Sequence, residues 1–512
     1  MHLFSENSIL IKNIAGFEGE TVELQGWVMN RRSGKGIVFV ILRDGSGFIQ
    51  CVGTQSDIGD EKFNLLESLG LESSLWLKGK VVRDDRQIGG YEVHIQDVKV
   101  YQNVSDYPIT KKEHGVEFLM DNRHLWLRSK RQWAAMRVRN QVIFSIHRFF
   151  QERGFVQMDS PIFTGNAVEG TSTLFETEFF DKPAYLSQSG QLYGEAMAMA
   201  QGLIYTFGPT FRAEKSKTRR HLSEFWMIEP EMAFYDLKKN MDLIEDFIRF
   251  LVVNVLENCR FELEVLERDL TYLKNVLNPF ERITYDEAVK ILKGEKSVNG
   301  KNSIELLKND LEQAKQRMKD IEAEIEDKEK LVKAGGLKKG AMAFNEEKIR
   351  LLKVELKELQ ELERNIPQWL ESAANFEYGN DFGGSDETVL TRIFDVPVMV
   401  YNWPKECKAF YMKEVEDNPC LVKGVDVLAP EGYGEIVGGG ERETDINKLI
   451  SSIEHHKLPM SAFEWYLDLR RFGSVPHAGF GLGLERFVSW MCKLQHVRES
   501  IPFPRMMGTL FP

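Results

Sequence analysis

A run of cationic residues between two apolar segments is the stretch of this sequence best suited to binding an anion. The first segment ends in 211–214, Phe-Arg-Ala-Glu, and the second begins with Glu224-Phe225. Between them stand Lys215, Lys217, Arg219, Arg220 and His221. Arginine binds phosphate through parallel donors, and the Phe225 ring offers a face to a purine. The pattern predicts two strands and a loop that bind a nucleoside triphosphate, although such a loop taken alone is more often a solvated hairpin tip.

Two carboxylates and a glycine run follow near the C-terminus. Asp426 lies in a strand-like segment, and Glu435 begins the next one, which contains Gly438-Gly439-Gly440. Magnesium commonly binds one or two carboxylates together with substrate phosphates. Glycines in a strand let a ligand approach the backbone closely. Because the chain has no GxxxxGK[ST] loop, we expect arginines and Mg²⁺ to hold the phosphates.

Two polar segments are candidates for binding a free amino acid. The segment 166–172 carries Glu169, and the turn 186–195 carries Gln191. An amino-acid ammonium group needs a carboxylate and an amide oxygen to fix it. Either residue taken separately is better explained as a loop carboxylate or a helix cap.

The order of these residues resembles the class II aminoacyl-tRNA synthetases, in particular their aspartyl, asparaginyl and lysyl subgroup. Residues 211–225 resemble motif 2, and His477–Val488, which alternates glycine before Leu-Glu-Arg, resembles motif 3. A helical pattern over 136–153 followed by a strand with a proline resembles motif 1, which builds the dimer interface. The resemblance implies an α+β catalytic domain on a mainly antiparallel sheet, and a homodimer.

The resemblance also implies roles for individual residues. The implied catalytic residues are Arg212, Glu214 and Arg486. The implied ATP-binding residues are Arg212, Glu214, Arg220, His221, Leu222, Phe225, Glu435, Gly483 and Arg486. The implied magnesium ligands are Asp426 and Glu435. In the implied first step, an amino-acid carboxylate attacks the α-phosphorus of ATP, and the protein positions the reactants and neutralises charge without a general base.

The pocket for the amino acid is the point at which the subgroup members differ. The resemblance implies that Glu169 and Gln191 bind the ammonium group, that Arg442 binds the side-chain carbonyl, and that Glu229 accepts from a side-chain amide. Aspartyl enzymes carry a lysine three residues after the matching glutamine, where this chain has Gly194. A carboxylate substrate would lose a contact worth roughly 1.5–3 kcal/mol. We therefore expect activation of asparagine and its transfer to the 3′ end of its tRNA.

The first 105 residues show five short strand patterns, at 22–28, 36–42, 48–52, 74–82 and 91–100. Such spacing predicts a small Greek-key barrel, the OB-fold, which binds single-stranded nucleic acid. Phe39 alone would sooner be a core residue than a ligand. By resemblance to the anticodon-binding barrel of the subgroup, Phe39 would stack on an anticodon base, Gln50 would read its edge, and Arg31 or Arg32 would contact the backbone.

The remaining sequence organises these sites. We expect five parts: a barrel at 1–105, a linker at 106–133, catalytic segments at 134–294 and 376–512, and an inserted antiparallel coiled-coil hairpin at 295–375. The hairpin balances acidic and basic residues, which favours a solvated coiled coil over a phosphate-binding arm. Scattered cysteines and the absence of a long apolar stretch or a signal-peptide pattern favour a cytoplasmic protein. The net charge of -12 leaves RNA binding to local basic patches.

Three other functions are compatible with parts of the pattern. The chain could be an aspartyl enzyme, or a synthetase-like enzyme that makes free asparagine with ammonia. It could also be a catalytically silent RNA-binding or scaffolding protein. The retained Arg212, Glu435 and Arg486 disfavour the silent protein, and the RNA-reading barrel disfavours the maker of free asparagine.

Overall fold

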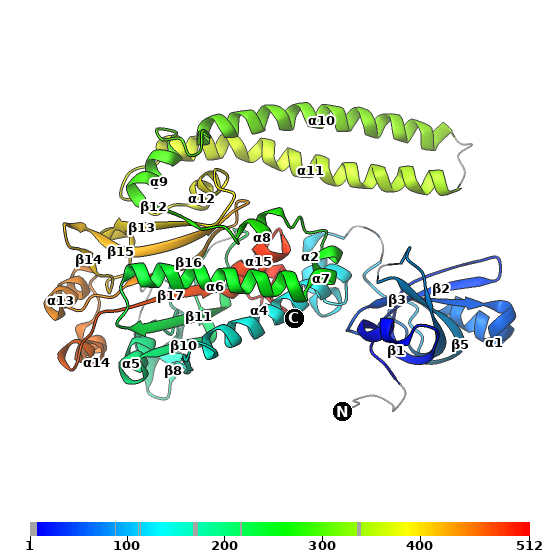
Figure 1. The fold of residues 1–512 in the computed structure, drawn as a ribbon, viewed down its shortest axis with the longest axis horizontal. Coiled ribbons are helices and arrows are strands. Elements are labelled where there is room, and N and C mark those ends of the chain that lie inside the picture. The colour runs from blue at the N-terminus through cyan, green and yellow to red at the C-terminus, as the bar shows by residue number, and fades with distance from the viewer. Residues whose placement is uncertain are drawn as a thin grey trace. The chain divides into compact units, whose positions relative to one another are not determined.

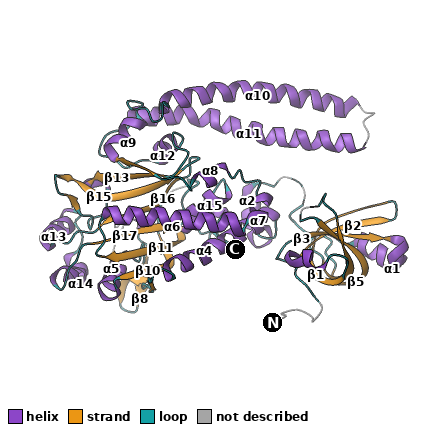
Figure 2. Cartoon of the chain, viewed as in Figure 1, coloured by secondary structure: helices purple, strands orange, loops and turns teal. Residues whose placement is uncertain are grey.

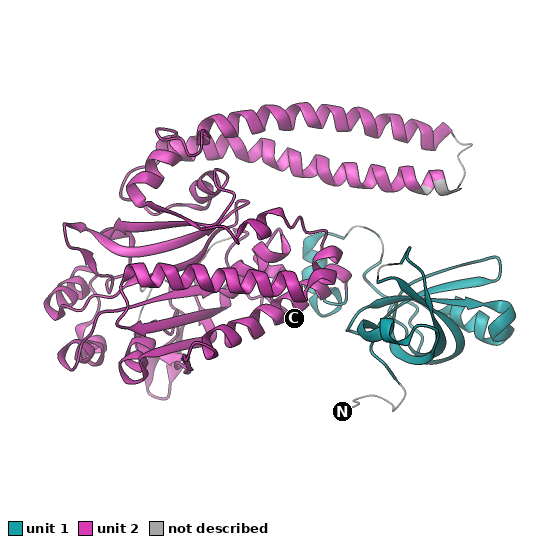
Figure 3. Ribbon diagram, viewed as in Figure 1, with its two compact units in different colours: residues 1–128 teal, residues 129–512 magenta. Residues whose placement is uncertain are grey.

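The computed structural model describes residues 8–511 apart from 88, 111, 113, 167–172, 216–217 and 335–338. The chain divides into two compact units, Met1–Arg128 and Ser129–Pro512 (Figure 3). The predicted linker at 106–133 thus falls mostly within the first unit. No helix in the described ranges is both long and apolar enough to cross a membrane.

The first unit is a closed barrel with strand order β1-β2-β3-β5-β4. Its strands are β1 (Thr21–Gly34), β2 (Ile37–Arg43), β3 (Phe48–Thr54), β4 (Ser74–Arg83) and β5 (Tyr91–Gln102), accompanied by η1 (Ile11–Phe17), α1 (Gln55–Ser68), α2 (Val116–Asp121) and α3 (Arg123–Trp126). Alternate residues of β2, Val38, Val40 and Leu42, are fully buried, which leaves Phe39 on the outer face. The OB-fold prediction is confirmed.

The second unit is built on a mixed sheet with strand order β12-β13-β15-β16-β17-β11-β10-β6 (Figure 2). These strands are β6 (Val156–Gln157), β10 (Leu203–Phe211), β11 (Glu224–Ala233), β12 (Glu281–Thr284), β13 (Val398–Pro404), β15 (Asn418–Ala429), β16 (Gly434–Glu441) and β17 (His477–Gly483), and β14 (Glu414–Val415) pairs with β15. Most neighbours are antiparallel, and the β12–β13 and β10–β6 pairs are parallel. This sheet confirms the α+β catalytic fold.

Amphipathic helices pack around this sheet (Figure 1). They are α4 (Lys130–Gln151), α5 (Gln191–Gln201), α6 (Leu237–Asn258), α7 (Arg260–Val265), α8 (Thr271–Asn275), α9 (Tyr285–Leu292), α12 (Gly384–Thr391), α13 (Ile446–His455), α14 (Met460–Arg471) and α15 (Leu484–Cys492), with single turns η3 (Lys405–Cys407) and η4 (Val497–Glu499). Phe149 of α4 and Phe480 of β17 both contact Phe247 of α6, with ring centroids 4.9 and 5.9 Å away. These aromatic contacts connect α4 to the strand that resembles motif 3.

A small sheet of order β7-β9-β8 lies beside α5 and carries exposed aromatic rings. It consists of β7 (Phe163–Thr164), β8 (Glu176–Phe179) and β9 (Lys182–Leu186). Phe163, Phe179 and Phe180 are 50, 47 and 87% exposed. An exposed apolar group of this kind is typical of a protein–protein contact.

The segment between α9 and α12 forms two long helices that lie side by side (Figure 1). They are α10 (Ser303–Ala334) and α11 (Lys339–Asn375). Their distal seam contains buried Ile321, Ile325 and Leu352. Their base joins the catalytic core, because Leu307 and Ile366 belong to the buried cluster that also holds Trp403 of β13.

Candidate active site

A cavity of about 290 Å³ opens between the central strands and α12. The predicted residues that line it are Gln191, Arg212, Glu214, Arg220, His221, Leu222, Phe225, Glu229, Asp426, Glu435, Arg442, Gly483 and Arg486. Glu169 lies outside the described residues. The catalytic-domain candidates within the described part of the chain therefore meet in one place, although they come from segments almost 300 residues apart.

The cationic end of the cavity is formed where β10 and β11 end. The two strands are antiparallel with Phe211 opposite Glu224, so Arg212 and Phe225 emerge at the same edge. The Arg212 guanidinium lies 5.4 Å from the centre of the Phe225 ring. Glu214 lies 3.5 Å from His221 across the loop. The predicted strand-loop-strand is thus present, with cations beside an aromatic face.

Arg220 is held by three acceptors on the opposite wall. Its guanidinium donates to Glu387 Oε2 at 2.5 Å, to Thr388 Oγ1 at 2.9 Å and to the Gly432 carbonyl at 2.5 Å. Burial and the nearby Glu435 charge raise the pKa of Glu387 to about 7, against the opposing effect of Arg220. A side chain at Gly434 is excluded, because its Cβ would lie 1.9 Å from Glu387 Oε2. Glu387 was not predicted from the sequence, because no motif marks it.

The two predicted magnesium ligands lie on paired strands next to a glycine. A Cβ at Gly438 would lie 2.8 Å from Glu435 Oε1 and 3.6 Å from Asp426 Oδ1, so both carboxylates face the space left by this missing side chain. Burial raises the pKa of Asp426 to about 8 despite Lys408, whose Nζ donates to Asp426 Oδ2 at 2.5 Å. Arg486 donates to Glu435 Oε2 at 2.9 Å.

These oxygen donors fit Mg²⁺, because Mg²⁺ needs only one or two carboxylates when phosphates supply further ligands. The part of the chain that the structure describes contains no cluster of three His, Cys, Asp or Glu residues suited to a metal ion. The Asp426–Glu435 pair would therefore depend on the substrate for the rest of its coordination. Lys408 was not predicted; a lysine in a turn gives no sequence signal of this contact.

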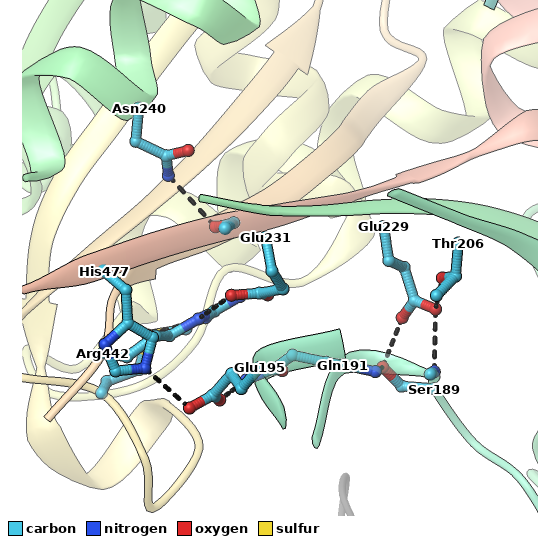
Figure 4. Close-up of polar contacts among 12 residues, drawn as sticks. Ser189, Gln191, Glu195, Thr206, Glu229, Glu231, Asn240, Arg442 and His477 are labelled. Carbon is cyan, nitrogen blue, oxygen red and sulfur yellow. Dashed lines mark hydrogen bonds and ion pairs between the residues drawn. The ribbon is translucent and has the colours of Figure 1, made fainter. Parts of the chain in front are cut away.

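Glu229 lines the cavity and accepts hydrogen bonds from three neighbouring groups (Figure 4). It accepts from the Ser189 hydroxyl, from Gly190 N at 2.8 Å and from Thr206 Oγ1 at 3.3 Å. Burial raises its pKa, while these donors act in the opposite direction. Glu229 thus adjoins Gly190, and the residue next to Gly194 is a different carboxylate.

That carboxylate is Glu231, which forms a buried ion pair with Arg442. A Cβ at Gly194 would lie 3.2 Å from Glu231 Cγ. Arg442 donates to Glu231 Oε1 at 2.5 Å and to Oε2 at 3.3 Å, and both side chains are almost completely buried. Sequence reasoning passed over Glu231, although its spacing of two from Glu229 puts both side chains on one face of β11.

In the barrel, one of the two candidate arginines accompanies Phe39 and Gln50. The Arg32 guanidinium lies 4.6 Å from the centre of the Phe39 ring and donates to Gln50 Oε1 at 3.2 Å. Arg31 instead donates to the Leu69 carbonyl at 2.9 Å. Arg32, Phe39 and Gln50 therefore form one group on the barrel, and Arg31 points elsewhere.

Comparisons with known proteins agree with both units. Residues 115–507 match the family model of tRNA synthetases class II (D, K and N), and residues 22–101 match the OB-fold nucleic acid binding domain. The chain belongs to the class II tRNA synthetases of the D, K and N group. The resemblance inferred from the motifs is thereby confirmed.

This class II synthetase is similar over nearly its full length to proteins named asparagine--tRNA ligase. It is 47% identical over 505 residues to the one from Symbiobacterium thermophilum and 48% identical over 505 residues to the one from Sorangium cellulosum, covering 98% of this chain and 99% of each relative. Its fold matches asparaginyl-tRNA synthetase from Pyrococcus horikoshii, solved with asparaginyl-adenylate, with a TM-score of 0.80 and 37% identity over 99% of this chain and 100% of that one.

Proposed function

We propose that this class II synthetase activates L-asparagine with ATP and transfers it to the 3′ end of tRNA(Asn). The observation that carries the proposal is one cavity in which the cationic side chains of Arg212, Arg220 and Arg486 lie together with Glu229 and Arg442. The relatives named asparagine--tRNA ligase and the Pyrococcus horikoshii structure with asparaginyl-adenylate support it.

The first step follows from the arrangement of charges in the cavity. The asparagine carboxylate attacks the α-phosphorus of ATP, the bond to the bridging oxygen breaks, and pyrophosphate leaves. Arg212 binds the α-phosphate, and Phe225 stacks on the adenine next to it. Arg220, His221 and Arg486 bind the leaving phosphates, with Arg220 released from Glu387. The protein accelerates the reaction by positioning and charge neutralisation.

The remaining predicted ATP residues complete this site. Glu214, Leu222 and Gly483 line the cavity with the cations and contact the nucleotide. Asp426 and Glu435 would hold Mg²⁺, which when bound supplies positive charge to the phosphates. Lys408 keeps Asp426 paired when no metal ion is bound there.

Selection of asparagine depends on a donor and an acceptor. Arg442 donates to the side-chain carbonyl, and Glu229, which lines the same cavity, accepts from the side-chain NH2. Aspartate would place a carboxylate against Glu229, where like charges repel. Glu229 also accepts from Ser189 and Gly190, which belong to the turn that precedes Gln191. Gln191 and Glu169 bind the ammonium group.

The proposal includes the assembly and the RNA partner. Arg32, Phe39 and Gln50 bind the anticodon of tRNA(Asn). Two copies of the chain pair as a homodimer through the segment that resembles motif 1, which contains α4. The exposed rings of Phe163, Phe179 and Phe180 extend this interface. The cytoplasm as the location stays a prediction.

The test is aminoacylation of tRNA(Asn) and tRNA(Asp) transcripts with radiolabelled asparagine and aspartate. The expected result is charging of tRNA(Asn) with asparagine alone. Charging with aspartate would identify an aspartyl enzyme. Formation of free asparagine from aspartate and ammonia without tRNA would identify a synthetase-like enzyme that makes free asparagine. Absence of ATP consumption would indicate a catalytically silent RNA-binding or scaffolding protein.

A further inference from the structure

A buried carboxylate that no motif marks lies one helical turn after Gln191. Glu195 is on α5, four residues from Gln191, and its side chain is fully buried. Residues four apart on a helix lie on the same face. Gln191 Nε2 donates to Glu195 Oε1 at 2.9 Å (Figure 4).

Three further donors complete the surroundings of this carboxylate. The Tyr466 hydroxyl donates to Oε1 at 2.7 Å, and Arg470 Nη2 donates to Oε2 at 2.8 Å. His477 Nε2 lies 2.9 Å from the same Oε2. Although burial opposes ionisation, Arg470 and His477 hold the pKa of Glu195 well below its usual range. The Glu195 side chain is therefore an ionised group that only accepts hydrogen bonds.

An acceptor-only neighbour fixes the orientation of an amide. The oxygen and nitrogen ends of a glutamine side chain are nearly equal in shape, so only the hydrogen-bond partners decide which way it points. Glu195 attracts the NH2 end and repels the oxygen end. The Gln191 oxygen is therefore turned away from Glu195, on a residue that lines the cavity beside Ser189 and Glu229. Among the described residues, no hydrogen bond reaches this oxygen.

We propose that Glu195 is a positioning residue that holds the Gln191 carbonyl oxygen toward the ammonium group of the amino-acid substrate. The inference rests on the proposed function, since it assigns a device to the same amino-acid site. With the amide reversed, Gln191 would present two N–H donors to an ammonium group that has only donors. Binding of the amino acid would weaken, and binding of ATP at the other end of the cavity would not.

The competing explanation is that Glu195 serves only as the counter-ion of Arg470 and His477. The two explanations differ in how the effects of Glu195 and Gln191 combine. An orienting residue loses its effect once the amide that it orients has been removed, because interacting residues are not additive. A counter-ion acts independently of Gln191.

A double-mutant cycle on the full chain separates them. Michaelis constants for asparagine and for ATP are measured by ATP–pyrophosphate exchange in the wild type, Glu195→Gln, Gln191→Ala and the double variant. We expect each single variant to raise the asparagine constant at least tenfold. The double variant should lie within twofold of Gln191→Ala, and the ATP constant should stay within twofold throughout. The inference would be overturned if the effects of the two substitutions on the Michaelis constant for asparagine multiplied in the double variant. It would also be overturned if Glu195→Gln left this constant unchanged.

Two controls keep the result interpretable. Tyr466→Phe removes another donor to Glu195 Oε1 and leaves Gln191 in place, so the asparagine constant should stay within twofold; a rise equal to that of Glu195→Gln would indicate a merely structural role. The competitor 3-carbamoylpropanoate is asparagine without its amino group, so its inhibition constant should be the same in wild type and Glu195→Gln. A different constant would contradict the role assigned to Glu195.

Folding is checked by the melting temperature of each variant. If Glu195→Gln does not fold, Glu195→Asp, which keeps a charge for Arg470 and His477, takes its place in the cycle with the same criteria. Failure of the wild type to exchange asparagine would remove the proposed function itself. Additive effects in an enzyme that does activate asparagine would remove only the role of Glu195.

Discussion

Three buried carboxylates in or near the cavity differ in their hydrogen-bond and ion-pair partners. Glu229 accepts from a hydroxyl, a backbone N–H and a second hydroxyl, and Glu195 is surrounded by four donors. Glu231 is paired with Arg442 and packs closely against Gly194, where an added Cβ would lie 3.2 Å from Glu231 Cγ. Of these three, Glu229 is the one that lines the cavity, which makes it the group best placed to meet a substrate amide.

The close packing at Gly194 provides a prediction about substrate binding, because Glu231 is paired with Arg442 and Arg442 lines the cavity. In Gly194→Ala the new Cβ would lie 3.2 Å from Glu231 Cγ and 3.6 Å from Ile204 Cδ1, so Glu231 must shift. We expect the Michaelis constant for asparagine to rise at least threefold and that for ATP to stay unchanged in pyrophosphate exchange. Gly208→Ala, on β10 with no atom within 4 Å of its Cβ, is the control and should behave as wild type. Equal behaviour of the two variants would refute the position assigned to Glu231.

A buried histidine provides a prediction about pH. Burial, with Arg498 and Arg219 adding to it, lowers the pKa of His496 to about 4, and its Nδ1 accepts from Arg498 N at 3.1 Å. The unfolded chain binds the proton near pH 6.5 and the folded chain only near pH 4. Neutral His496 therefore costs the folded state nothing above about pH 6.5. As the pH falls from about 6.5 toward about 4, the unfolded chain gains a proton that the folded chain does not bind, and the free energy of unfolding decreases.

Replacement of this histidine should reduce the loss of stability in acid. Between pH 6.5 and 4.5, the melting temperature should fall more in the wild type than in His496→Asn, which keeps an acceptor at the start of η4. Exposed His94→Asn should follow the wild type. Parallel curves for the wild type and His496→Asn would show that this histidine does not resist protonation.

At the scale of elements, the hairpin of α10 and α11 has two parts with different support. Its base shares the buried cluster of the catalytic sheet, and its distal seam is a separate cluster. Arg219 belongs to the predicted phosphate-binding loop, and both of its terminal nitrogens donate a hydrogen bond to Glu361 Oε2 of α11, each at 3.2 Å. Because both side chains are partly exposed, this ion pair contributes at most about 1 kcal/mol.

The division of the hairpin predicts two kinds of destabilisation. Ile321→Ala in the distal seam should cost about 2–5 kcal/mol locally, as for other buried isoleucines. Amide hydrogen exchange should then speed up in α10 and α11, with pyrophosphate exchange unchanged within twofold. Leu307→Ala at the base should lower the melting temperature of the catalytic unit. Exposed Leu331→Ala is the control, and a loss of activity in Ile321→Ala would show that the distal part serves the active site.

The elements were more predictable from sequence than the contacts between them. Local periodicity predicts the two strands around the cationic loop and the strands of the barrel. The preference for asparagine over aspartate was predicted from one residue, Gly194. Glu387 and Lys408 were not predicted, because their partners Arg220 and Asp426 are 167 and 18 residues away. The contacts of Glu195 were not predicted for the same reason, because its partners Arg470 and His477 are 275 and 282 residues away in the sequence. Only the folded chain brings these charges together.

At the scale of the whole molecule, the OB-fold barrel and the class II synthetase domain are separate compact units. The group of Arg32, Phe39 and Gln50 lies in the first unit, and the substrate cavity lies in the second. With a net charge of -12, the chain must bind RNA through local groups of this kind. Damage to one unit should therefore leave the chemistry of the other intact.

A variant of the barrel tests this separation. Phe39→Ala should raise the Michaelis constant for tRNA(Asn) about tenfold in aminoacylation, since one stacked base contributes about 1–3 kcal/mol. Pyrophosphate exchange without tRNA should keep its rate. Tyr101→Ala, which removes another exposed ring from the barrel, is the matched control and should leave both reactions unchanged. An unchanged constant for tRNA(Asn) in Phe39→Ala would exclude Phe39 from the anticodon site.

The central claim is that the cavity accepts a neutral carboxamide next to a bound triphosphate. Its most direct test is ATP–pyrophosphate exchange by the wild-type chain with asparagine or aspartate as the only amino acid. We predict rapid exchange with asparagine and less than a hundredth of that rate with aspartate at the same concentration. Equal or faster exchange with aspartate would contradict the account.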